Sequence, residues 1–369
     1  MEDSIGTRSD PAAQRWAIDD GVTQLRLWGT EIIYPLEAGE EPTIGASDVC
    51  PIRIEDPSGQ VSRTHARVVR AQSGWNVRDL ESKNGVYIDG TRCREGLLVP
   101  GTELGIGDVI LIAESRQLIA LRGFLARLIG WGDRQQVDRA LRIVRLAATR
   151  HTPLVLSGEG DLVPTSLSLH THVHGHDKPF ILCDPRRRRG DADVRSVANY
   201  KDPRHALRAA IGGSLCLLRR RLPPDASVVL DEARRSRPRV QLIICAHENE
   251  RVLAELLVAD PIVVPPLAGR GHELDRIISE YATEAMRELG AARSTFTERE
   301  HEWVRTHAAS TLTEIEKGTR RLVALRAAGT AHSAAARLGM APVSLIRWIG
   351  RRDVLDELRL KDPPMPHDT

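Results

Sequence analysis

The chain has 369 residues, of which 41% are hydrophobic and 28% are charged, and its formal net charge is +2. This length allows two or three domains, each with its own core. No apolar run approaches the ~20 residues that a bilayer-crossing helix needs, and the N-terminus lacks the apolar centre of a signal peptide. The scattered cysteines include no C-x-x-C pair, so we expect a cytoplasmic protein with reduced thiols and no membrane association.

The N-terminal third of the chain is predicted to be rich in β-strands. Residues 1–20 are expected to form a disordered N-terminus. Between about Val22 and Ala120, short β-rich runs alternate with turn dipeptides such as Asn84-Gly85 and Asp89-Gly90. Strands at this spacing indicate a β-sandwich.

Two motifs in this region give it a family resemblance. The segment V-S-R-T-H-A begins at Val61, and W-N-V-R-D-L-E-S-K-N-G begins at Trp75. A serine and a histidine three residues apart, followed by a tryptophan strand that ends in S-K-N-G, resemble the forkhead-associated (FHA) phosphothreonine-binding domain. The resemblance spans residues 21–121 and implies an all-β sandwich with its ligand loops at one end.

The resemblance also implies roles for individual residues. Ser62 would donate a hydrogen bond to a phosphate, Arg63 would add positive charge, and Asn84 would hold the ligand backbone. His65 would brace the loop without touching the ligand. The candidate phosphopeptide-binding residues are Ser62, Arg63, Ser82, Lys83 and Asn84.

One position departs from the FHA pattern. The glycine-arginine pair that usually precedes the first binding loop reads Gly45-Ala46 here. A hydrogen bond to a charged group contributes about 1.5–3 kcal/mol, so the loss of this arginine removes a principal phosphate contact. Two interpretations stay open: Arg63 compensates for Ala46, or Ser62, Arg63 and Asn84 only hold the loops or serve a partner that is not phosphorylated.

The middle of the chain is predicted to be an α/β domain. We expect a linker over residues 122–133, and then a domain over residues 134–290 that begins with a helix at Arg134–Arg150. Strands rich in Val, Ile and Leu alternate with helical stretches, as in a parallel sheet. The order of the pieces resembles the AAA+ domain of bacterial enhancer-binding proteins, which activate sigma-54 promoters. The similar features are G-E at Gly158, G-G-S-L at Gly212 and P-P-L at Pro265, before a long helix of an expected helical lid.

The residues that such an ATPase needs are missing. A phosphate-binding loop requires a lysine for the outer phosphates, followed by Ser or Thr for magnesium. The chain reads G-E-G-D-L-V-P-T-S from Gly158, where Asp161 repels phosphate and Pro164 lacks an N–H. The strand expected to end in Asp-Glu ends in Leu218-Arg219 instead. The sigma-contacting loop and the trans-acting arginines of the family are also absent. We therefore expect a non-hydrolysing scaffold, with no catalytic residue and no cofactor.

Two side-chain patterns in this domain allow a second interpretation. The alternating residues His170, His172, His174 and His176 could share the face of a strand as metal ligands do. The family has a helix at this place, and neither Cys nor carboxylate completes a zinc spacing, so we expect no metal. The basic run Arg219 to Arg221 would be a solvated face or an auxiliary contact to DNA phosphates.

The C-terminal region, residues 291–352, is predicted to be all-α. Helices are expected at Thr297–Thr311 and Leu312–Ala328, before a segment from Ser333 to Arg352 that fits a helix-turn-helix. In that motif Ala335 would be the small residue where the two helices cross, Gly339 would lie in the turn, and Leu345 would be the apolar anchor of the second helix. The segment resembles the Fis-type helix-turn-helix that ends enhancer-binding proteins, with a recognition helix over residues 342–351. The candidate DNA-binding residues are Arg337, Val343, Ser344, Arg347, Arg351 and Arg352. A plain helical hairpin is the alternative, and residues 353–369 would be a flexible tail.

Together these patterns predict a sequence-specific DNA-binding transcriptional regulator, a repressor or modulator, that is not an enzyme. Its partners would be double-stranded DNA with paired half-sites, bound as a homodimer, and a protein that carries phosphothreonine. The main alternative is an interaction adaptor without specific DNA binding. A working ATPase that activates sigma-54 promoters is a third hypothesis, which the missing residues argue against.

Overall fold

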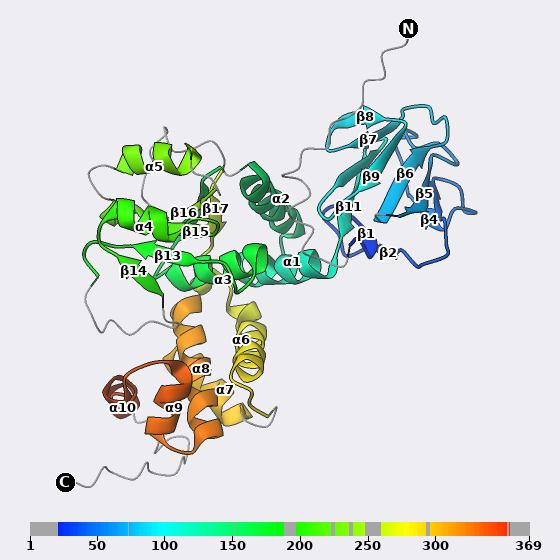
Figure 1. Ribbon diagram of the computed structural model, residues 1–369. Coiled ribbons are helices and arrows are strands. Elements are labelled where there is room, and N and C mark those ends of the chain that lie inside the picture. Colours follow the sequence, from blue (N-terminus) through cyan, green and yellow to red (C-terminus); the bar gives the residue numbers. More distant parts are fainter. Residues whose placement is uncertain are drawn as a thin grey trace, which may run out of the picture. The chain divides into compact units, whose positions relative to one another are not determined.

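The computed structural model describes residues 21–72, 74–150, 152–187, 197–222, 226–235, 239–247, 260–292, 296–352 and 354 (Figure 1). The expected flexible termini, residues 1–20 and 353–369, lie outside these ranges except for Val354. The chain divides into two compact units. The first comprises Met1–Ala126 and Trp131–Arg150, and the second comprises Arg127–Gly130 and His151–Thr369.

The first unit contains a β-sandwich of two sheets, which confirms the fold expected for the N-terminal region. One sheet has the strand order β2-β1-β11-β10-β7-β8 and the other has the order β4-β3-β5-β6-β9. Neighbouring strands are antiparallel except for β3 and β4, which are parallel. The strands are β1 (Gln24–Leu27), β2 (Ile33–Pro35), β3 (Thr43–Gly45), β4 (Ile52–Arg53), β5 (Ala66–Ala71), β6 (Gly74–Asp79), β7 (Val86–Ile88), β8 (Thr91–Cys93), β9 (Glu95–Leu98), β10 (Glu103–Ile106) and β11 (Val109–Glu114).

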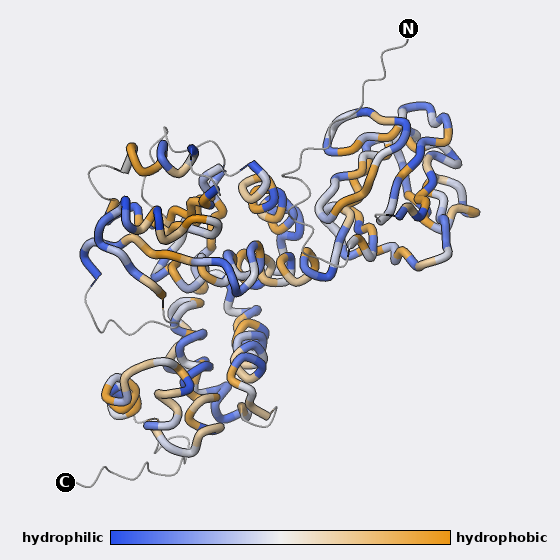
Figure 2. The backbone as a smooth tube through the Cα atoms, in the orientation of Figure 1, coloured by the Kyte–Doolittle hydropathy of each residue, from blue (hydrophilic) through white to orange (hydrophobic). Residues whose placement is uncertain are grey.

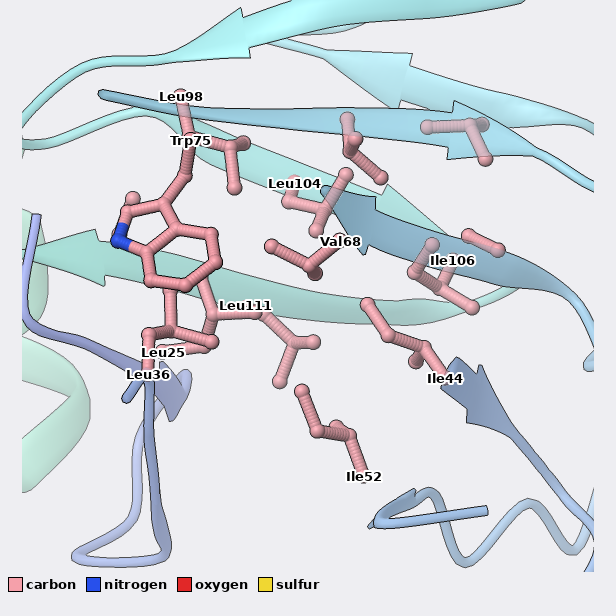
Figure 3. Packing of buried hydrophobic residues seen from close by; sticks show 14 of the residues in the cluster. Leu25, Leu36, Ile44, Ile52, Val68, Trp75, Leu98, Leu104, Ile106 and Leu111 are labelled. Atoms are coloured by element: carbon pink, nitrogen blue, oxygen red, sulfur yellow. The ribbon is translucent and has the colours of Figure 1, made fainter. Parts of the chain in front are cut away.

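Alternation along the strands builds the core between the two sheets. Successive side chains of a strand point to opposite faces, so Trp75 and Val77 of β6 both face inward. Trp75 is 1% exposed, and its indole N–H donates to the carbonyl of Val22 at 3.1 Å. Figure 3 shows the ring packed among side chains from both sheets. They include Leu25, Leu36, Ile44, Val68, Leu98, Leu104 and Leu111.

A buried arginine joins the sandwich to a helix. Arg26 on β1 forms an ion pair with Glu114 on β11 at 2.7 Å, and a second one with Asp138 at 2.5 Å. Asp138 lies on α2 (Arg134–Arg150) and also accepts from the backbone N–H of Gly29. Burial by itself would lower the pKa of Arg26, but its hydrogen bond to Asp138 and the two negative charges raise it above the ordinary value.

These helices change the domain boundaries that the sequence suggested. α1 (Arg116–Ile129) occupies most of the segment that we expected to be a linker, residues 122–133. α2 has the predicted bounds, but it groups with the sandwich and not with the α/β domain that we placed at residues 134–290. The physical reason is the charge of Asp138, because a buried carboxylate needs the buried guanidinium of Arg26.

The second unit contains a parallel sheet, as predicted. Its strand order is β14-β13-β15-β16-β12-β17, and all its neighbouring strands are parallel. Every residue of β12, β13 and β16 is buried, the pattern expected of a parallel sheet with both faces covered. The elements of this part are β12 (Leu154–Gly158), α3 (Val163–His174), β13 (Phe180–Cys183), β14 (Ala198–Tyr200), α4 (Pro203–Ala209), β15 (Ser214–Leu218), α5 (Ala226–Arg235), β16 (Gln241–Ala246) and β17 (Ile262–Val264).

Three histidines of the series, His170, His172 and His174, lie on the helix α3 and not on a strand, and His176 follows the helix. His170 of α3 is 2% exposed, and its two ring nitrogens contact the hydroxyl of Ser214 at 2.7 Å and the carbonyl of Lys178 at 3.1 Å. Burial lowers the pKa of His170, so its ring is kept neutral near pH 7. His170 is thus a hydrogen-bonded core residue.

The remainder of the second unit is helical. It comprises α6 (Leu274–Glu288), α7 (Glu298–His307), α8 (Leu312–Ala328), α9 (Ala331–Leu338) and α10 (Pro342–Gly350). Threonine side chains mark the starts of several helices: Thr311 and Thr330 each accept from a backbone N–H in the first turn of α8 and α9. Among the described segments, we find no helix of the length and apolarity that a bilayer crossing requires.

The Arg26 cluster yields a stability prediction. Asp138→Ala should lower the free energy of unfolding of the first unit by about 3–5 kcal/mol, because it leaves a buried guanidinium short of one partner. Hydrogen exchange of the β1 and β11 amides measures the effect. Arg78→Ala is the control, since Arg78 pairs with Glu95 on the surface and should change stability by about 1 kcal/mol or less. Equal losses in the two variants would contradict the prediction.

Candidate functional site

Three loops come together at one end of the sandwich. The β3–β4 loop donates two backbone hydrogen bonds to the β4–β5 loop, from Ala46 to the carbonyl of Ser62 at 3.0 Å and from Ser47 to that of Arg63 at 3.1 Å. Gly45 makes this approach possible. A Cβ atom at position 45 would lie 2.1 Å from the carbonyl oxygen of Arg63, so any other residue would push the loops apart.

His65 connects the β4–β5 loop to the β6–β7 loop. The backbone N–H of Ser62 donates to Nδ1 of His65 at 3.0 Å, and Nε2 lies 3.0 Å from the carbonyl oxygen of Gly85. Because Nδ1 accepts, the neutral ring carries its proton on Nε2 and donates it to Gly85. His65 is fully buried, in agreement with the bracing role that the sequence suggested.

Ser62 lies where these loops meet. Its hydroxyl oxygen accepts from the backbone N–H of Lys83 at 3.0 Å and keeps its own hydrogen available to donate. The side chains of Arg63 and Lys83 are exposed, one on each side of this contact in the two loops. The arrangement offers a hydroxyl donor together with two cations, the groups that a phosphate needs.

The other two candidate residues are engaged within the loops. Ser82 accepts at its hydroxyl from the backbone N–H of Gly85 at 3.0 Å. The side-chain amide of Asn84 donates to both the backbone and the side-chain oxygen of Gln60, each at 2.7 Å. Its Oδ1 is the atom left to accept from a ligand backbone. The sequence did not indicate Gln60 as the partner of Asn84. The two residues are 24 positions apart, and a polar residue in a loop carries no signal of such a contact.

Ala46 leaves the β3–β4 loop without a cation at its start. Its methyl group packs against the sandwich core, and three residues later Val49 is 78% exposed. The other two loops supply positive charge at this end of the sandwich, through Arg63 and Lys83.

The C-terminal helices α9 and α10 are joined by a short turn, at the place where the sequence predicted a pair of helices. Ala335 and Leu345, the predicted crossing and anchor residues, are fully buried. Gly339 follows α9 in the left-handed region, with φ of 66°, and Pro342 opens α10, where its missing N–H costs nothing. The short turn and the buried anchor hold the two helices together.

Most residues of α10 are hydrophobic (Figure 2). Its exposed surface is a mixture of apolar and basic side chains. Val343 is 64% exposed and Ile346 is 50% exposed. Arg347 and Arg351 are exposed and Ser344 is half-buried. The first turns of α10 thus carry the predicted recognition residues on the side away from the core.

Arg352 is placed differently from the other candidates. Its guanidinium lies 3.8 Å from Glu314 and 5.6 Å from the ring of Trp348, while that of Arg321 lies 5.0 Å from the same ring. Trp348 also packs edge-on against Trp303 at 5.5 Å. Arg352 therefore helps to fix α10 on the neighbouring helices. Arg337, on α9, is exposed and makes a long contact, 3.5 Å, to the carbonyl of Leu289.

In the second unit, the loop after β12 forms a hydrogen bond within itself. The carboxylate of Asp161 accepts from the backbone N–H of Val163 at 3.0 Å, at the start of α3. Pro164 follows in the first turn and has no N–H to offer. An acid already occupies the helix start where a phosphate would otherwise bind.

The loop geometry predicts a central role for His65. His65→Ala should remove the links to Ser62 and Gly85 and cost about 1–3 kcal/mol, because two buried backbone groups lose their partner. Hydrogen exchange should then accelerate at residues 62 and 83–85. Thr64→Ala, an exposed neighbour, should leave exchange unchanged. Unaltered protection in the His65 variant would show that the loops hold each other without it.

Comparison with known proteins bears on the sandwich. Residues 43–113 match the family model of the FHA domain. A structure from an analysis of phosphothreonine-dependent FHA domain interactions is 26% identical and covers 26% of this chain and 95% of its own, with a TM-score of 0.23. An FHA domain from Chlamydia trachomatis is 23% identical over 24% of this chain and 92% of its own, with a TM-score of 0.23.

A third structure is EmbR of Mycobacterium tuberculosis in complex with a low-affinity phosphopeptide. It is 28% identical over 25% of this chain and 24% of its own, with a TM-score of 0.23. No curated protein is significantly similar to the chain. The family match confirms the expected resemblance in the N-terminal part: residues 43–113 form an FHA domain.

Proposed function

We propose that the chain is a DNA-binding transcriptional regulator whose FHA domain binds a phosphorylated protein partner. The observation that carries the phosphoprotein-binding half of this proposal is the position of Ser62 at the loop end of the sandwich. Its hydroxyl contacts the backbone of Lys83, and the side chains of Arg63 and Lys83 are exposed. A hydroxyl donor on loops that also carry two exposed cations suits a phosphate on threonine. Oδ1 of Asn84 suits a backbone N–H of the same peptide.

The DNA-binding half of the proposal rests on α9 and α10. A buried anchor, a left-handed glycine and an exposed face with Val343 and Arg347 suit a helix that enters a major groove. Arg351 and Arg337 would contact phosphates, and Ser344 a base or a phosphate. Arg352 would act by positioning α10. Binding as a homodimer to paired half-sites is part of the same proposal.

The α/β sheet would be an AAA+-like scaffold that does not hydrolyse ATP. Two observations support this part. The loop after β12 opens at the carboxyl edge of the sheet, where α/β proteins bind ligands, yet Asp161 already occupies the start of α3. β15 is followed by Arg219 and not by an acidic pair that could hold magnesium. The scaffold would connect the partner-binding and DNA-binding parts of the chain.

An interaction adaptor without specific DNA binding is the second candidate. Val343 and Ile346 favour it, because two exposed aliphatic side chains on one short helix also suit a protein partner. The two functions separate experimentally, since only the regulator needs Arg347 for the choice of a DNA sequence.

Phosphate recognition can be tested in both directions. Ser62→Ala should weaken binding of phosphothreonine peptides about tenfold, and Ala46→Arg should strengthen it by a similar factor, because each changes one bond to a charged group. A degenerate peptide library, phosphorylated or not, read by fluorescence anisotropy measures both effects. Thr91→Ala, at an exposed position on strand β8, is the control. Equal binding of the phosphorylated and the non-phosphorylated library would indicate that these loops bind a partner that is not phosphorylated.

DNA recognition can be tested with a random duplex library selected on the full chain near physiological salt. The expected outcome is enrichment of a paired half-site motif. Arg347→Ala should reduce the affinity for that motif about tenfold, as expected for a lost base contact of about 1–3 kcal/mol. Arg299→Ala, an exposed arginine at the start of α7, should have no effect. Recovery of duplexes without any shared motif would contradict the proposal of a transcriptional regulator and favour the interaction adaptor.

A further inference from the structure

A cavity of about 440 Å³ lies at the carboxyl ends of four neighbouring strands of the parallel sheet. Its walls are the residues that follow β12, β13, β15 and β16. The carboxyl edge is where open α/β sheets bind their ligands, and this volume is within the range of small-molecule sites.

The charge of the wall is unusual for such a cavity. The described lining includes four arginines and two aspartates, with His247 beside them. The arginines come from two strand ends: Arg187 follows β13, and Arg219, Arg220 and Arg221 follow β15. The net positive charge favours an anionic ligand.

The carboxylates of this lining do not form a metal site. Asp184 is 2% exposed and pairs with Arg221 at 2.5 Å, while its other oxygen accepts from the backbone N–H of Arg186. Asp161 accepts from the backbone N–H of Val163 through one oxygen, and the described residues include no group of three potential metal ligands. An anionic ligand in this cavity would therefore meet the guanidinium groups directly.

Arg219 is the arginine that most needs an acceptor. Its Nε atom is buried and has no hydrogen-bond partner among the described residues. A buried donor without a partner is destabilising, so an acceptor in the cavity would relieve it. Guanidinium groups bind phosphate oxygens in pairs of parallel hydrogen bonds.

We propose that this cavity binds a small phosphorylated ligand through Arg219 and Arg220, without a metal ion. The proposal goes beyond DNA and phosphoprotein binding and does not depend on either. Phosphoryl groups of a nucleotide and of a free polyphosphate share the required chemistry. Arg221 is a positioning residue, because its charge is already paired with Asp184.

Calorimetric titration of the full chain with pyrophosphate and, separately, with ATP tests the proposal, both in the presence of EDTA. Arg219→Gln should weaken the binding of both probes tenfold or more, as expected for the loss of a hydrogen bond between charged groups. Arg220→Gln, at an exposed position, gives a second variant that should fold normally. Arg208→Gln, exposed on α4 away from the cavity, is the matched control and should bind as the unaltered chain does.

Four results would overturn the proposal. Binding that requires Mg²⁺ would mean that carboxylates hold a metal after all. Equal affinities in the Arg219, Arg220 and Arg208 variants would place the probe elsewhere, and loss of binding in Ser62→Ala would place it on the FHA loops. Displacement of pyrophosphate by duplex DNA that is lost in the Arg219 variant would assign the basic run to DNA phosphates.

Discussion

The buried guanidinium of Arg26 sets the limits of the first unit. It joins β1 to β11 through Glu114 and to α2 through Asp138, so three segments that are far apart in the chain share one charge cluster. Buried ions are tolerated only when each has its partners, and this requirement fixes α2 on the sandwich. The three loops of the candidate site connect strands of the same sandwich, and a rigid framework is what a loop-built binding face needs.

The FHA loops and the helix α10 expose side chains by different means. In the loops, hydrogen bonds through His65 and the close approach at Gly45 hold the backbone, so that Ser62 can donate while cations stay in solvent. On α10 a packed face has this role: Trp348 lies beside the guanidinium groups of Arg321 and Arg352, and Val343 and Ile346 are exposed. Both are exposed surfaces supported by buried contacts.

The carboxyl edge of the parallel sheet carries more basic than acidic side chains. The carboxylate of Asp161 lies at the start of α3, and three arginines follow β15. The described lining of the cavity at this edge has four arginines and two aspartates. Such an edge suits an anion, because backbone topology supplies the strand ends and the concave shape and the arginines supply the charge.

The sequence by itself determined the β-sandwich, the FHA motif, the parallel sheet and the position of the C-terminal helices, because these follow from local periodicity, turn residues and short motifs. It could not place α2 with the sandwich, since Arg26 and Asp138 are 112 positions apart. Tertiary structure alone decided that Asn84 is held by Gln60, that Arg352 packs on Trp348, and that arginines from separate strand ends share one cavity. Contacts between distant segments leave no periodic signal, and only the folded chain brings their charges together.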